Sequence, residues 1–79
     1  MRTQTEKEQY IAQAKIDRDA YTLALMRDNW QTGIKIEHKY GLYGYSPELV
    51  SVGLNAAVEG KDPEMVIETY IVDRMMGNN

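Results

Sequence analysis

The sequence predicts a small all-α protein, a bundle of three to four helices. One helix-start pattern occurs twice, as Ser-Pro-Glu-Leu at residues 46–49 and as Asp-Pro-Glu-Met at 62–65. The stretch 6–29 contains neither proline nor glycine and is rich in alanine. The chain has 79 residues, 43% of them apolar and 27% charged, which suits a single helical domain over residues 1–79.

The first helix is predicted over about residues 6–29. Thr5 and Glu8 have the spacing of a capping box, in which the threonine side chain accepts from a free backbone N–H and the glutamate reaches back. Wound at helical pitch, the segment shows two apolar stripes, whereas a surface helix of a monomer needs only one. The first stripe holds Ala12, Ile16, Ala20, Leu23 and Trp30, and the second holds Tyr10, Ala14, Tyr21 and Leu25.

Residues 31–45 fit two patterns. Ile34, Ile36, His38 and Tyr40 alternate as in a strand, whereas Trp30, Ile34, His38 and Leu42 recur every fourth residue as on a helix. We expect a short helix over 34–40 that ends at Gly41, because a single strand would have no partner in the chain. Gly44 and the tyrosines beside it would then form a loop.

The third helix is predicted over residues 47–59, with Ser46 as its cap and Pro47 at its first position. Its polar face is narrow, so most of the helix should be buried. That face holds Glu48, Ser51, Asn55 and Glu59. Gly53 lies in the apolar arc, where glycine costs about 1 kcal/mol relative to alanine, so we expect another helix to approach closely there. Gly60 ends the helix.

The fourth helix is predicted over residues 63–76, from the cap Asp62 to a stop at Gly77. One side carries Val66, Ile67, Tyr70 and Ile71, and the opposite side carries Met65, Val72, Met75 and Met76. A strand over 65–72 is the competing interpretation, since valine, isoleucine, threonine and tyrosine favour strands. The Asp-Pro-Glu start favours the helix.

The first and fourth helices carry more apolar surface than a chain of this length can cover, which is typical of a partner site. We therefore predict a homo-oligomer, most simply a two-fold dimer. The predicted interface comprises Tyr10, Ala14, Tyr21, Leu25, Met65, Val72, Met75 and Met76. If the chain itself encloses both helices, this prediction fails. Residues 1–4 and 77–79 are expected to be frayed tails.

Composition and charge restrict the classes of function. The chain has no cysteine, which excludes a disulfide framework and a thiolate metal site, and no apolar run reaches the roughly 20 residues that span a bilayer. The N-terminus alternates charges, unlike a signal peptide, so we expect a cytoplasmic protein. Residues 46–79 hold two basic and six acidic side chains, a net charge of −4 that disfavours phosphate binding.

Aromatic and basic residues in the middle of the chain form the predicted binding site for a protein partner. They are Trp30, Lys35, Lys39, Tyr40, Tyr43 and Tyr45. Tryptophan, tyrosine and basic residues are favoured at the hot spots of protein interfaces. The same residues could instead stack single-stranded nucleic acid, although residues 29–45 carry a charge of only +1. Alternatively, Trp30 and Tyr40 belong to the core and the loop tyrosines shield it.

Residues 36–50 have the layout of a helix-turn-helix, which is the basis of the alternative function, a nucleic-acid-binding regulator. Residues 47–59 contain no lysine or arginine to contact bases and phosphates, and residues 43–45 lengthen the turn. A helical hairpin of the core is therefore the favoured interpretation, and nucleic acid is not the expected partner.

Catalytic and metal-binding motifs are weak. His38 is the one histidine and lacks the further ligands of a zinc site or the partners of a catalytic triad. Asp17 and Asp19 lie two residues apart on a helix, so they point in different directions and are expected on a solvated face rather than around a metal. Residues 41–44 hold two glycines without the lysine of a phosphate loop. The sequence predicts no enzyme, cofactor or metal.

The expected function is non-catalytic protein binding by a homo-oligomer, with itself and a second protein as partners. Many small free-standing proteins of this kind are accessory or inhibitory factors, including the viral proteins of phages and those of mobile elements. The viral or mobile-element origin is expected only because such proteins are common there; no residue of this sequence indicates it.

Overall fold

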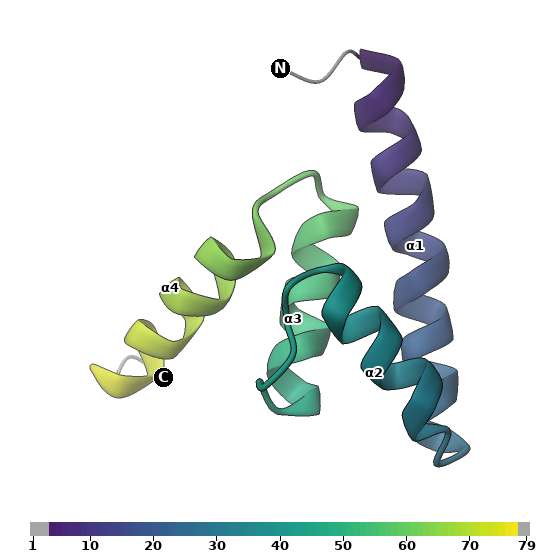
Figure 1. Ribbon diagram of the computed structural model, residues 1–79. Helices are drawn as coiled ribbons and strands as arrows, with labels where there is room; N and C mark the ends of the chain where they lie inside the picture. The colour runs from purple at the N-terminus through teal and green to yellow at the C-terminus, as the bar shows by residue number, and fades with distance from the viewer. Residues whose placement is uncertain (1–3, 78–79) are drawn as a thin grey trace.

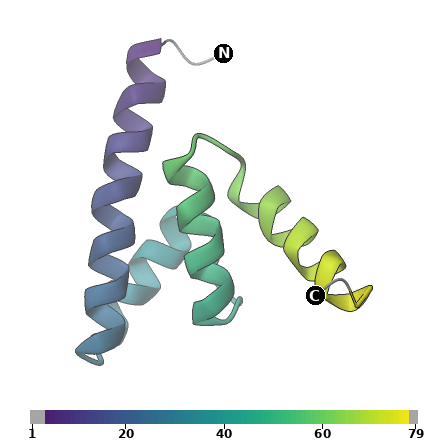
Figure 2. The same ribbon diagram turned by 180° about the vertical axis from the view of Figure 1, so that it is seen from behind.

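The computed structural model describes residues 4–77, which form four α-helices: α1 (Gln4–Met26), α2 (Trp30–Lys39), α3 (Pro47–Val58) and α4 (Pro63–Met75). The predicted all-α class is confirmed. α1, α3 and α4 lie in a row with α3 in the middle, and α2 crosses one side of the α1–α3 pair (Figure 1, Figure 2). The molecule measures 39 × 34 × 17 Å, so it is only about one and a half helix diameters thick. None of the helices within residues 4–77 is long and apolar enough to cross a membrane.

α3 and α4 begin where the sequence predicts. Ser46 Oγ accepts a hydrogen bond from the amide of Leu49 at 3.4 Å, and Asp62 Oδ1 accepts from the amide of Glu64 at 3.0 Å. Both helices end one residue before the predicted position. Gly60 and Gly77 follow with φ angles of 77° and 76°, the left-handed conformation that glycine adopts at helix ends.

The boundary between α1 and α2 differs from the prediction. α1 stops at Met26 instead of about residue 29, Asp28 adopts a φ of 54°, and the amide of Asn29 donates back into the last turn of α1. Asn29 then caps α2, because its Oδ1 accepts from the amide of Thr32 at 3.3 Å. A left-handed aspartate ends the helix as a glycine would. α2 therefore starts a full turn earlier than the predicted 34–40.

The start of α1 also corrects a prediction. The helix already includes Gln4, so Thr5 lies inside its first turn and the predicted capping box of Thr5 with Glu8 is wrong. Gln4 and Gly77, which were predicted to be tail residues, belong to the described structure. The other predicted tail residues, 1–3 and 78–79, lie outside the described residues.

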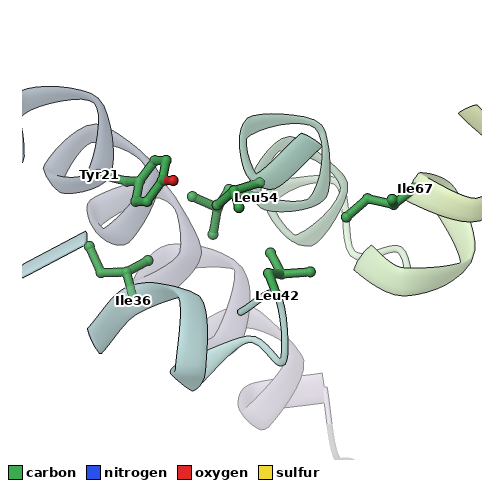
Figure 3. Close-up of a cluster of buried hydrophobic side chains, with 6 residues drawn as sticks. Tyr21, Ile36, Leu42, Leu54 and Ile67 are labelled. Carbon is green, nitrogen blue, oxygen red and sulfur yellow. The ribbon is translucent and has the colours of Figure 1, made fainter. Parts of the chain in front are cut away.

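The core forms where α1, α2 and α3 meet and continues to α4. Its large buried side chains are Tyr21, Ile36, Leu42, Val50, Leu54 and Ile67. In the view of Figure 3, Leu54 of α3 lies between Tyr21 of α1 and Ile67 of α4. A Cβ at Gly53 would lie 2.9 Å from the Cδ1 atoms of both Ile67 and Leu42, so the close approach predicted at Gly53 is confirmed. Five of the twelve residues of α3 are buried and four more are half-buried, so the helix is less fully enclosed than the sequence predicts.

The chain covers only one of the two stripes predicted on α1. Ala14 and Tyr21 of the second stripe are fully buried, whereas Ile16 and Leu23 of the first stripe are exposed. Ala14 and Tyr21 were predicted to contact a second copy. The structure places both in the core of a single chain, where they offer no surface to a partner, because α2 and α3 pack over this side of α1.

Candidate protein-binding surfaces

Asp17 on α1 is a nearly buried carboxylate, not the solvated residue that the sequence predicted. The hydroxyl of Tyr40 donates to Asp17 Oδ2 at 2.6 Å, the ammonium of Lys39 lies 2.8 Å from the same oxygen, and the Gln13 amide donates to Oδ1 at 3.2 Å. Burial alone would raise the pKa of Asp17, but the hydrogen bonds from Lys39 and Tyr40 outweigh burial and lower this pKa below its usual 3.8. Burial and the bond to Asp17 raise the pKa of the Tyr40 phenol.

Lys39 and Tyr40 therefore connect α2 to α1. Both were predicted to anchor a partner, and the structure uses both inside the chain. Tyr10 joins the same contact edge to face, with 6.1 Å between the centres of the Tyr10 and Tyr40 rings and 64° between their planes. The sequence did carry one signal for this cluster: Asp17 lies three residues after Ala14 and four before Tyr21, on the buried stripe of α1.

A second polar contact lies further along the same two helices. The Tyr21 hydroxyl donates to Glu37 Oε2 at 2.7 Å, and burial together with Glu37 raises the pKa of this phenol. Tyr21 is thus a core residue with its polar end satisfied by α2. No spacing rule couples residues that lie this far apart in the sequence, so the pairing is visible only in the fold.

The remaining predicted partner residues are dispersed. Tyr43 is exposed and stacks on His38, with 4.3 Å between the ring centres and 13° between the planes. Tyr45 is half-buried against the core. Lys35 is exposed on α2. Trp30 lies at the opposite end of α2 from Lys39, so the structure does not gather the six predicted residues into one site.

Trp30 instead forms an apolar surface with the end of α1. We name this the corner surface; it consists of Leu25, Met26, Trp30 and Ile34, which are 36%, 78%, 67% and 41% exposed. A small pocket of about 40 Å³ lies beside it, lined by Leu25, Trp30 and Ile34 together with Tyr21 and the turn between the two helices. The pocket is far below the roughly 300 Å³ of a typical small-molecule site, so it suits one inserted side chain.

The outer side of α4 is the second exposed apolar surface. We name it the methionine face; it consists of Met65, Val72, Met75 and Met76, which are 65%, 50%, 81% and 71% exposed. The opposite side of α4 packs on α3 through the fully buried Ile67. Arg74 Nη1 lies 2.8 Å from Glu48 Oε2, and the Tyr70 hydroxyl donates to the same oxygen at 3.1 Å, which fixes α4 to the start of α3.

Two other classes of site, a metal centre and a nucleic-acid recognition helix, find little support in the described geometry. Across residues 4–77, no three histidine, cysteine, aspartate or glutamate side chains gather where they could share a metal ion. The candidate recognition helix, α3, lies between α1 and α4 with five of its residues buried, and its exposed Asn55 accepts from Arg18 of α1 at 3.3 Å.

Comparison of the chain with protein-family models, with curated proteins and with solved structures finds no match.

Proposed function

We propose that this chain is a non-catalytic, homo-oligomeric protein-binding factor, in which the corner surface joins two copies and the methionine face binds another protein. The observation that supports the proposal most directly is the exposure of Trp30 beside Leu25 and Ile34. A tryptophan next to a side-chain-sized pocket has the composition and geometry of an interface hot spot. An exposed apolar group of this size is costly in water unless a partner covers it.

The charges around the corner surface suit a second copy. Asp28 and Glu37 line the pocket, and the exposed cations Arg27 and Lys35 adjoin it in sequence. Two acids and two bases give this rim no net charge. In a two-fold arrangement the same patch meets itself, so a balanced rim can place each charge opposite one of the other sign.

The charges around the methionine face do not suit a second copy of that face. Its exposed acids are Glu64, Glu68 and Asp73. The one base on α4, Arg74, is already paired with Glu48. Two such faces brought together would repel each other. Met65, Val72, Met75 and Met76, which the sequence assigns to the oligomer interface, are therefore proposed to bind a different protein instead.

The non-catalytic part of the proposal is supported by the roles of the polar groups. The imidazole of His38 stacks on Tyr43, and the three side chains with the clearest pKa changes near the core, Asp17, Tyr21 and Tyr40, join α1 to α2. The alternative of a helix-turn-helix regulator gains no support, since α3 has no lysine or arginine to contact bases and phosphates and carries the acid Glu48.

Sedimentation velocity over a range of protein concentrations tests the self-association. We expect wild-type protein to sediment above the 9.1 kDa of one chain, and Trp30→Ala with Ile34→Ser to return it to the monomer while helicity is retained. Met75→Ser is the matched control, because Met75 is also exposed and apolar but lies on the other surface. A wild-type protein that stays monomeric at every concentration, or a dimer that survives both corner substitutions, would contradict the proposal.

A further inference from the structure

We infer that the methionine face of α4 is a docking site for a basic amphipathic helix of another protein. This inference rests on the proposed function, since it names the partner class of the surface that self-association leaves free. It follows from the shape of the apolar stripe, from the charges beside it and from the chemistry of methionine.

The stripe runs along the whole of α4. Met65, Val72 and Met76 are spaced by seven and four residues, so they lie on one side of the helix, directly opposite Ile67. Figure 2 shows α4 at the edge of the molecule, separated from α1 by α3, so no other helix of the described chain covers this side. Thirteen residues give a stripe about 20 Å long, which matches three to four turns of a partner helix.

Carboxylates flank the stripe on both sides. Glu68 lies on one flank and Asp73 on the other, and both are exposed. The nearest cations are already neutralised, because Arg74 pairs with Glu48 at 2.8 Å and Lys61 pairs with Glu59 at 3.0 Å. The field at this face is therefore negative, which attracts lysine and arginine and repels nucleic acid and anionic lipid.

Methionine favours an adaptable site. Its unbranched thioether side chain can repack around partner side chains of different shapes, and Met65, Met75 and Met76 are the three most exposed residues of the methionine face. An apolar stripe between acidic edges is the complement of a helix with an apolar stripe between basic edges. That complementarity defines the occupant.

Binding of a synthetic peptide tests the inference. The probe is a labelled amphipathic helix of about 14 residues, close to the length of α4, with leucine on one side and lysine on the other. We expect saturable binding by fluorescence anisotropy that weakens as salt is added. The matched peptide with glutamate in place of lysine should not bind.

Paired variants separate specific docking from general attraction to an acidic protein. Glu68→Gln with Asp73→Asn should weaken the lysine peptide about fivefold, the effect of two exposed ion pairs. Glu8→Gln with Asp19→Asn changes the net charge equally on α1 and should leave binding unchanged. Met65→Ser with Val72→Ser should weaken binding more than about tenfold, whereas Ile16→Ser with Leu23→Ser, an exposed apolar pair on α1, should not.

Three outcomes would overturn the inference. Equal losses of peptide affinity in the α4 and α1 variants would show that the peptide is attracted to acidic or apolar surfaces in general. Binding of the glutamate peptide would show that the negative charges beside the methionine face do not select the partner. Loss of self-association in Met65→Ser with Val72→Ser would assign the methionine face to a second copy. A monomeric wild-type protein would contradict the proposed function, yet peptide binding with the expected variant pattern would still support this docking site.

Discussion

Asp17 shows how one polar residue can hold two helices together. Its carboxylate is nearly buried on α1, and each group that satisfies it from α2, the Lys39 ammonium and the Tyr40 hydroxyl, comes from the C-terminal end of that helix. A buried carboxylate is stable only when such donors surround it. The α1–α2 contact thus depends on a polar cluster as well as on apolar packing.

We expect Asp17→Ala to reduce the free energy of unfolding by about 2–3 kcal/mol, since it leaves the Tyr40 hydroxyl without its acceptor in a largely buried place. Urea denaturation followed by circular dichroism measures the change. Asp19→Ala is the control: Asp19 is exposed and, among residues 4–77, forms an ion pair with Arg18 alone, so its loss should cost less than about 1 kcal/mol. An equal loss of unfolding free energy in the two variants would show that the buried cluster stabilises the fold no more than an exposed ion pair does.

The same carboxylate predicts a pH dependence. Because the fold lowers the pKa of Asp17, the ionised form stabilises the folded state above the ordinary value of 3.8, and this contribution disappears as the pH falls through the lowered pKa. Asp17→Asn resembles the protonated form. Wild-type protein should therefore be more stable than Asp17→Asn at neutral pH, and the difference should shrink in acid below pH 3.8. A difference that stays constant across that range would contradict this assignment.

At the scale of the helices, the sequence predicted the elements better than their contacts. Ser46, Asp62 and the glycines that follow α3 and α4 act locally, so their positions could be read directly. The end of α1 could not be read from the sequence, because Asp28 adopts the left-handed conformation that glycine usually adopts at a helix end. Lys39 and Tyr40 were assigned to a partner because composition does not tell whether a polar residue meets another protein or Asp17 of its own chain.

Two glycines inside helices should respond oppositely to alanine. Gly53→Ala should destabilise the protein by about 1 kcal/mol or more, because the new Cβ would lie 2.9 Å from buried atoms of Ile67 and Leu42. Gly33→Ala should stabilise it by up to about 1 kcal/mol, since its Cβ would meet the Tyr21 ring at an ordinary 3.6 Å and alanine favours the helix. Thermal denaturation of both variants measures the signs, and a shared sign would contradict the packing described here.

On the scale of the whole molecule, the four helices form a thin layer in which α4 packs chiefly against α3. Figure 1 shows α4 diverging from α1, and the polar contact of Arg74 and Tyr70 with Glu48 supplements the buried Ile67. A helix held from one side has fewer apolar contacts to lose when it opens. The helix that we assign to partner binding is therefore also the one with the fewest buried residues, since Ile67 alone is buried on α4.

Ile67→Ala should expose this weakness. The substitution removes a fully buried side chain at a cost of about 2–5 kcal/mol, and most of that cost belongs to the contact between α4 and α3. Hydrogen exchange read by mass spectrometry should show protection lost over residues 63–75 while α1 and α3 stay protected. Val72→Ala, on the exposed side of the same helix, should leave exchange unchanged. Uniform loss of protection over all four helices would show that the fold opens only as a unit.

The exposed indole at the start of α2 has a practical consequence. Trp30 is the only tryptophan in the chain, so the intrinsic fluorescence excited at long ultraviolet wavelengths reports on one spot of the corner surface. Emission from a water-exposed indole lies far to the red and moves toward the blue when solvent is displaced. The spectrum of the unlabelled protein, recorded during dilution, can therefore follow the covering of this spot without any added dye.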